Sequence, residues 1–483
     1  MSSNDTAYSG VFLERLSAYG AKRSEQAPYI YRPNELFLIF TNRVLTTFFT
    51  SAFRSWITKP DAPADTATFF AAVLAVSMAL SPFLLSISMW GLVFTAFWHL
   101  ERVRRQEQYP RPWWTLPGRS FQSFFRQPEY AFFMLLLLTP AISGLWSDDQ
   151  AYWLTRTRVR LPFLVLPWAF ANLPRLSGRQ LRLVLYLLVW LMVVLCAGVG
   201  INYRIHQDAI LEALQQGRSI PVPRNHIRFS LMLATAVIAG GWLWRNRFVL
   251  RFAWERHALA AATFFLFIFL HFLSVRSGLA AFYLAIFFTL ARFIWRTRRW
   301  KLGLAAVLFL IVAPWAAVKT LPSLAHKLAY SRYDWERYRE NEGGAYSDAG
   351  RWVSLQSGYL VWEQNKWLGA GAGDLPAAVR QAVQQHFPAY QTQPKLPHTQ
   401  FLYILASTGL FGLALSLAAF LCPVFVDGFR KHYLFAAFQV MIFASFLVEY
   451  TIETAMGVAW YLFYTLWFMQ IACKQKNLTD SIS

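Results

Sequence analysis

The sequence predicts an all-α polytopic membrane protein with about 12 transmembrane helices and one large loop on the extracytoplasmic side. Of its 483 residues, 56% are hydrophobic and 18% are aromatic, which is typical of a chain whose solvent is the bilayer. Apolar runs of about twenty residues recur, and each is long enough to cross about 30 Å of hydrocarbon. Short arginine-rich loops separate these runs, as expected for loops held in the cytoplasm.

The net charge of +21 lies in the short loops between apolar runs. This placement argues against nucleic acid as a partner and favours anionic membrane lipids. The cysteines Cys196, Cys422 and Cys473 fall within or at the end of apolar runs, so their pattern predicts neither a disulfide framework nor a metal site. We therefore expect no metal and no cofactor.

The N-terminus lacks the pattern of a removable signal peptide, so we expect it in the cytoplasm. Residues 33–58 mix aromatic residues with arginines, which predicts a helix lying in the membrane interface. The predicted spans are 68–84, 86–100, 130–146, 158–174, 182–201, 229–244, 257–274, 278–295, 303–320, 401–426, 434–450 and 456–472. The first two come from one long run that we divide at Ser81-Pro82, because proline denies the helix a donor.

Five basic loops follow alternate spans and are predicted to be cytoplasmic. Their basic residues are Arg102, Arg104 and Arg105; Arg175, Arg179 and Arg182; Arg245, Arg247 and Arg251; Arg296, Arg298 and Arg299; and Arg430 and Lys431. The resulting segments are a cytoplasmic N-terminal segment (1–67), helices 1–9 (68–321), a periplasmic loop domain (322–400), helices 10–12 (401–473) and a cytoplasmic tail (474–483). A structured loop as long as 322–400 usually carries function.

A few arginines fall on the outer side, against the general charge bias: Arg228, Arg276 and Arg351. Arg276 lies in the tight turn between spans seven and eight, where Ser277 is able to cap the next helix, and a helix N-terminus with a guanidinium makes an anion site. For a single arginine at the end of a span, the favoured interpretation is that Arg276 extends to lipid phosphate. In the large loop, Asp348 is a candidate helix cap, and the helix that follows has an apolar seam predicted to rest on the membrane domain. The seam residues are Trp352, Leu355, Tyr359 and Trp362.

Arg351 lies in the first turn of that helix and would point toward whatever the helix covers, or simply pair with Asp348 or Glu363. The glycine-rich stretch 369–374 resembles a dinucleotide fingerprint, but no strand precedes it and it lies outside the cell. We interpret it as a compact turn after which Asp374 caps the next helix.

His398 precedes the tenth span, where a positive helix end favours a neutral imidazole that can accept a proton. For histidines within apolar spans, such as His271, a hydrogen-bonded core role is expected instead. Glu449 and Glu453 flank the short outer loop between spans eleven and twelve. A carboxylate there is costly unless it is paired, so these two either orient an arginine or an acceptor or are ordinary interfacial carboxylates.

From about residue 225 to residue 468 the order of motifs resembles the O-antigen ligase and polymerase superfamily, the WaaL and Wzy group of membrane glycosyltransferases. The motifs are Asn225-His226-Ile227-Arg228-Phe229-Ser230, Arg276-Ser277-Gly278, Gly350-Arg351-Trp352, Trp367-Leu368-Gly369-Ala370-Gly371-Ala372-Gly373, Pro397-His398-Thr399-Gln400-Phe401-Leu402 and Ser407-Thr408-Gly409-Leu410-Phe411-Gly412. Family members often have Asn where Thr399 stands. The N-terminal half matches only in hydropathy.

The resemblance implies a GT-C-like fold in the bacterial inner membrane, with an active site on the periplasmic side. It implies an inverting, metal-independent transfer of a glycan from undecaprenyl diphosphate to an acceptor hydroxyl. We favour a ligase, whose acceptor is lipid A-core. Arg276 and Arg351 would bind the diphosphate, His398 would activate or position the acceptor hydroxyl, and Arg228, Glu449 and Glu453 would line the site. Arginines near the leaving diphosphate stabilise the charge that accumulates in the transition state.

Three alternatives remain open. A polymerase would use the same site but take a second lipid-linked glycan as acceptor. A protein O-oligosaccharyltransferase is less favoured, because no sizeable extra domain follows the last span. A lipid-linked sugar transporter would also have many spans, but transporters usually place ionisable residues near the middle of the bilayer.

Overall fold

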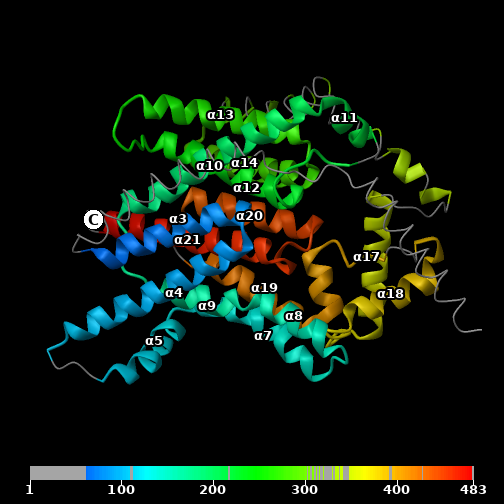
Figure 1. The fold of residues 1–483 in the computed structure, drawn as a ribbon, viewed down its shortest axis with the longest axis horizontal. Coiled ribbons are helices and arrows are strands. Elements are labelled where there is room, and N and C mark those ends of the chain that lie inside the picture. The colour runs from blue at the N-terminus through cyan, green and yellow to red at the C-terminus, as the bar shows by residue number, and fades with distance from the viewer. Residues whose placement is uncertain are drawn as a thin grey trace, which may run out of the picture. The chain divides into compact units, whose positions relative to one another are not determined.

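The computed structural model describes residues 61–108, 112–215, 218–301, 347–390, 394–426 and 428–480, with scattered positions between 302 and 346. All regular elements of this described part are helices, as predicted (Figure 1). The expected interfacial helix 33–58 lies outside the described residues. Most of the expected span 303–320 lies outside them too.

Within the described residues, nine helical segments are long and apolar enough to cross a membrane. They are α3 (Ala62–Leu80), α4 (Pro82–Arg105), the run from α6 (Pro128–Ala131) through η2 (Phe132–Met134) and α7 (Leu135–Ile142) to η3 (Ser143–Leu145), α10 (Gly178–Ile205), α12 (His226–Arg245), α13 (Glu255–Leu273), α14 (Arg276–Thr297), α19 (Gln400–Phe425) and α21 (Ala455–Asp480). This is a multi-pass membrane protein.

The remaining described helices are shorter or less apolar. They are α5 (Leu116–Phe125), α8 (Gln150–Arg160), α9 (Pro162–Asn172), α11 (Gln207–Gln215), α17 (Ser347–Gln364), α18 (Leu375–His386), α20 (Tyr433–Val448) and the 3₁₀ turns η1 (Trp113–Thr115), η4 (Pro388–Tyr390) and η5 (Thr451–Glu453).

The predicted count of 12 spans is therefore not confirmed. The division at Ser81-Pro82 is confirmed, because α3 ends at Leu80 and Ser81 caps α4. The predicted fourth span, 158–174, is not one helix, since α8 ends at Arg160 and α9 begins at Pro162. With 11 residues, α9 is about 16 Å long and too short to cross alone.

Helix α21 forms the centre of the packed core. Its side chains Trp460, Tyr461, Tyr464 and Trp467 are fully buried against α9, α10 and α20. The indole of Trp460 donates to Thr235 Oγ1 at 3.0 Å, so this buried N–H is satisfied. In α13, His271 bonds to the Phe267 carbonyl and the Tyr283 hydroxyl, which confirms the core role expected for it.

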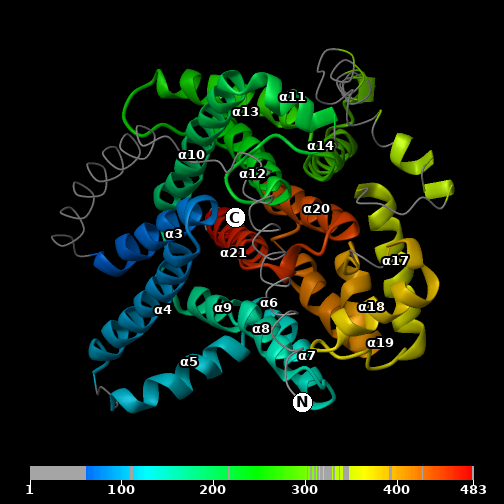
Figure 2. The ribbon, with the colours of Figure 1, turned by 45° about the vertical axis from the view of Figure 1, so that its right-hand side comes forward.

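Two contacts join segments that were predicted to lie in or next to cytoplasmic loops. Arg179 Nη2 donates to the Leu250 carbonyl at 2.9 Å, and Arg292 Nη2 donates to the Lys431 carbonyl at 2.9 Å. Helices α12 and α14 end in these basic loops and begin at the opposite end, next to α17 (Figure 1 and Figure 2). That opposite end holds most of the candidate site residues.

Candidate functional site

Arg228 lies in the first turn of α12, at the helix end that faces the large loop. Asn225 caps this helix, because its Oδ1 accepts hydrogen bonds from the N–H groups of Ile227 and Arg228. The Arg228 side chain is almost completely buried, and its Nη2 donates to the Tyr450 carbonyl at 3.5 Å. Its Nε is buried with no hydrogen-bond partner among the described residues.

Arg276 is the first residue of α14, and a close helix contact fixes its position. Ser274 ends α13 in the left-handed conformation, and Val275 is the N-cap of α14. The prediction that Ser277 caps this helix is wrong, since no side chain caps it. A Cβ added to Gly278 would overlap the Ser230 side chain, so the glycine of the Arg-Ser-Gly motif lets α14 approach α12.

The Arg276 guanidinium forms a two-point ion pair with the Asp348 carboxylate, at 2.8 Å and 2.6 Å. Asp348 lies in the first turn of α17 but is not its cap. Instead Asp334, which is fully buried, accepts the N–H groups of Asp348 and Ala349. Burial raises the pKa of Asp334, and the two N–H donors act in the opposite direction.

Arg351 does not pair with Asp348 or Glu363, the two partners considered for it. Among the described residues it approaches Glu449, whose Oε2 lies 4.0 Å from Arg351 Nη2. The other oxygen of Glu449 lies 3.9 Å from Arg228 Nη1. Neither approach is a hydrogen bond, so the buried carboxylate lies between two guanidinium groups without being locked to either. Burial raises the pKa of Glu449, and the two arginines oppose that shift.

His398 lies in the segment that leads into α19. Its N–H donates to Ser354 Oγ at 3.3 Å, and its ring lies edge to face with Tyr450. A Cβ added to Gly358 would lie 2.6 Å from Pro397 Cγ, so α17 holds the Pro397-His398 segment in place through a residue without a side chain. Next to this segment, Thr399 Oγ1 accepts the Leu402 N–H and caps α19.

The His398 imidazole is neutral at physiological pH. Burial lowers its pKa to about 4, with further lowering from Arg351, Lys395 and Arg228; the carbonyl of Leu396 acts in the opposite direction. Nδ1 lies 2.9 Å from that carbonyl, so Nδ1 carries the proton that it donates. Nε2 is then the nitrogen with a lone pair, and it receives no hydrogen bond from the described residues.

Helix α17 connects these groups, through three residues spaced three positions apart. Asp348 binds Arg276, Arg351 approaches Glu449, and Ser354 holds the His398 backbone. Residues at this spacing lie on one face of a helix, about 4.5 Å apart along its axis. The structure therefore brings Arg228, Arg351, His398 and Glu449 together and connects Arg276 to them through α17.

Glu453, the remaining predicted site residue, does not join this cluster. Its carboxylate forms a buried ion pair with Arg160 and accepts Gln400 Nε2 at 2.8 Å. Gln400 is the first residue of α19, and its Oε1 accepts the Ile452 N–H at 3.0 Å. Glu453 therefore fixes the start of α19, two residues after His398.

The glycine-rich stretch packs on a kink in α19. Gly369, Gly371 and Gly409 have positive φ angles, and Gly371 N–H donates to the Ser407 carbonyl at 2.9 Å. The predicted compact turn is thus confirmed. Asp374 occupies the predicted N-cap position of α18, but its side chain does not bond to that helix, because its carboxylate accepts the N–H groups of Asp148 and Asp149 at 2.8 Å each.

The apolar seam predicted for α17 does not rest on the membrane domain. Trp352 and Tyr359 are exposed, and together with His386 and Phe387 they line a groove of about 540 Å³. The buried face of α17 instead carries Val353 and Val361 among small residues. The prediction about this seam is wrong because α17 packs through its small residues and not through its aromatic ones.

Residues 259–417 match a family model described as O-Antigen ligase, and this span contains Arg276, Arg351 and His398. The match covers 159 of the 483 residues, about a third of the chain. The resemblance to the O-antigen ligase and polymerase superfamily is thereby confirmed. No curated protein matches the chain.

The matched segment does not contain the whole cluster. Arg228, on α12, precedes the matched span, and Glu449, after α20, follows it. Sequence reasoning missed Lys395, which lies close to Gly350 and whose pKa is lowered by burial and by Arg351. It also missed Arg160, which lies near the start of the predicted span 158–174. A positively charged residue in that apolar run was the available signal.

Cations predominate at this site. Four cations, Arg228, Arg276, Arg351 and Lys395, outnumber the three nearby carboxylates of Glu449, Asp348 and Asp334, so the arrangement favours an anionic ligand. Among the described residues, no three His, Cys, Asp or Glu side chains lie close enough to hold a metal ion.

Proposed function

We propose that the chain is an O-antigen ligase-type glycosyltransferase at the periplasmic face of the bacterial inner membrane. It would move a glycan from undecaprenyl diphosphate to a sugar hydroxyl of lipid A-core. The observation that carries the proposal is that Arg351 and Arg228 flank Glu449 next to a neutral His398, in and beside the segment that matches the O-antigen ligase model.

His398 acts on the acceptor. Its Nε2 accepts the proton of the acceptor hydroxyl while that oxygen bonds to the anomeric carbon of the donor sugar. The bond from this carbon to the phosphate oxygen breaks, and the lipid diphosphate leaves with the electron pair. One displacement of this kind inverts the anomeric configuration and requires no metal ion.

Arg351 and Arg276 bind the diphosphate, and Arg228 and Glu449 line the site. Guanidinium groups aimed at the leaving phosphate stabilise the negative charge that grows there. The same anion raises the pKa of His398, because it offsets the positive charges that depress it. Donor binding therefore makes the imidazole a better base than it is in the empty site.

Glu453 contributes by position and does not touch the donor, since its carboxylate is already bound by Arg160 and Gln400. The groove beside Trp352 and Tyr359 supplies exposed ring faces on which a sugar chain can pack. The charged groups of the site lie at helix ends, which favours an enzyme over a lipid-linked sugar transporter.

The test is reconstitution of the full chain with an undecaprenyl-diphosphate-linked glycan and either lipid A-core or a second lipid-linked glycan, with and without a chelator. We expect transfer to lipid A-core, unaffected by the chelator and abolished in His398→Ala. Elongation on the lipid carrier would instead identify a polymerase. Strict dependence on added Mg²⁺ would contradict the mechanism.

A further inference from the structure

A second charged site lies at the other end of the helices that carry the candidate active site. Helix α14 begins at Arg276, and its 22 residues span about 33 Å, close to the thickness of the hydrocarbon core. Helix α20 ends just before Glu449 and begins at Tyr433, beside the basic loop. The last turns of α14 and the first turn of α20 therefore lie at the opposite membrane face.

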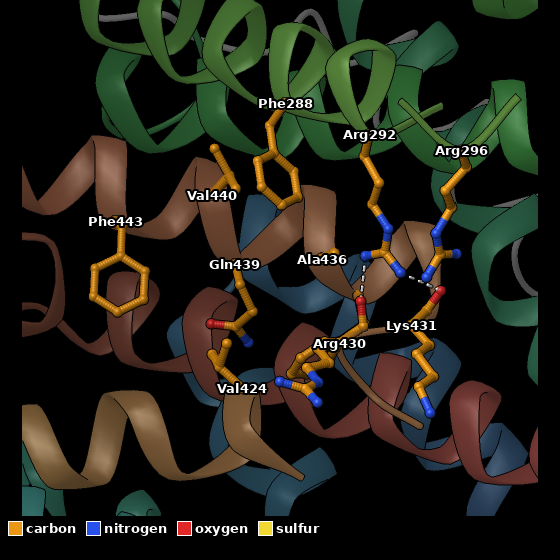
Figure 3. A pocket seen from close by; sticks show the side chains of 11 residues that line it. Phe288, Arg292, Arg296, Val424, Arg430, Lys431, Ala436, Gln439, Val440 and Phe443 are labelled. Atoms are coloured by element: carbon orange, nitrogen blue, oxygen red, sulfur yellow. Dashed lines mark hydrogen bonds between the residues drawn. The ribbon is translucent and has the colours of Figure 1, made fainter. Parts of the chain in front are cut away.

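A groove of about 540 Å³ opens between these two helices (Figure 3). Four cations line one end of it, and no carboxylate is among its lining residues. The lining residues are Phe288, Arg292, Arg296, Val424, Arg430, Lys431, Phe435, Ala436, Gln439, Val440 and Phe443.

The groove changes from basic to apolar along its length. On α14, Arg296, Arg292 and Phe288 lie four residues apart on one face, so the apolar end is about 12 Å from the basic end. On α20, Val440 and Phe443 continue the apolar wall away from Lys431. A charged end at the interface and an apolar end in the hydrocarbon match the headgroup and acyl chain of a lipid.

The basic end is organised by its own contacts. Arg292 donates to the carbonyls of Arg430 and Lys431 and lies over the Tyr433 ring, 5.2 Å from its centre. Its guanidinium lies next to that of Arg296, and both point toward the loop that carries Arg430 and Lys431 (Figure 3). Like charges held this close repel one another, and a bound phosphate relieves the repulsion.

We propose that this groove binds an anionic glycerophospholipid of the cytoplasmic leaflet. Its phosphate lies among Arg292, Arg296, Arg430 and Lys431, and one acyl chain follows Phe288, Val440 and Phe443. Basic pockets between membrane helices on the cytoplasmic side are suited to anionic lipid headgroups. The cytoplasmic placement follows from the five basic loops, and the site is independent of the proposed transfer reaction.

The experiment measures lipid binding to the purified full chain in neutral detergent by native mass spectrometry. The probes are phosphatidylglycerol, phosphatidylcholine with the same acyl chains, and inorganic phosphate. We expect phosphatidylglycerol to bind at least about tenfold more tightly than phosphatidylcholine, with a preference that shrinks as salt rises. Inorganic phosphate should compete only weakly, because it lacks the acyl chain.

The variant Arg296→Gln/Lys431→Gln should lose most of this preference, since it removes two of the four charges but leaves Arg292 in place. The control Arg299→Gln/Lys301→Gln removes two charges that follow the end of α14 but do not line the groove, and it should keep the preference. Equal binding of the two lipids by the unaltered chain would overturn the proposal, and so would equal loss in both variants. If the groove variant does not fold, the salt dependence of the unaltered chain is the test. A preference for phosphatidylglycerol that does not change with salt would overturn the proposal.

Discussion

Arg276 and Asp348, 72 residues apart in the chain, form a two-point ion pair that joins the start of α14 to the first turn of α17. Both side chains retain solvent access, so the pair contributes less than about 1 kcal/mol to the free energy of unfolding. Its importance lies in orientation: a guanidinium bound at two points by a carboxylate is held in a fixed plane.

Replacing Arg276 by alanine should lower kcat/KM for the lipid-linked donor roughly 100-fold to 1,000-fold, because one donor to the leaving phosphate is lost. The melting temperature should change little. Rates measured with reconstituted protein check the first expectation, and thermal unfolding checks the second. Arg380→Ala, an exposed arginine of α18, is the matched control and should transfer normally. If Arg276→Ala transfers at the normal rate, the Arg276 side chain does not bind the diphosphate.

The pH dependence should reflect the depressed pKa of His398. Because that pKa is about 4 in the empty site, the imidazole of the free enzyme is neutral above about pH 5. The value of kcat/KM, which reports the free enzyme, should therefore stay level from pH 8 down to pH 6. Arg351→Gln removes a positive neighbour, stabilises the imidazolium and should move the acid limb to higher pH. The rate profile and an NMR titration of His398 provide the measurement. If the acid limb of the profile does not shift in Arg351→Gln, Arg351 does not lower the pKa of His398.

Glu453→Leu should destabilise the protein by about 3–5 kcal/mol, because it leaves the buried Arg160 charge without its partner. The double variant Arg160→Met/Glu453→Leu removes both charges and should recover much of that loss. Thermal unfolding of the two variants in one detergent makes the comparison. If the single and double variants melt at the same temperature, the pair does not hold α19 in place.

Gly358→Ala should impair transfer more than it impairs folding. Its Cβ would lie 2.6 Å from Pro397 Cγ, so the segment carrying His398 has to move away from Ser354. Gly241→Ala in α12 is the control, because nothing lies within 4 Å of its added Cβ. The control should be neutral or slightly stabilising, since alanine favours helix more than glycine does. Equal rates in the two variants would contradict the positioning role of α17.

Hydropathy and charge were sufficient to place Arg228, Arg276, Arg351 and His398 at one end of the helices, because those signals depend on local sequence. The partners of these residues were not predictable in the same way. Asp348 looked like a helix cap, and its pairing with Arg276 depends on how α17 docks on the bundle. The aromatic seam of α17 misled for a related reason: periodicity identifies a face, but Gly358 and its small neighbours decide which face packs.

Helix α17 holds its three contacts on successive turns of one rigid rod. A slide of that rod by a single residue, about 1.5 Å, would loosen Arg276, Glu449 and the His398 backbone in the same movement. Donor affinity and the position of the His398 base would then change together. The position of this one helix therefore decides both donor binding and the placement of the base.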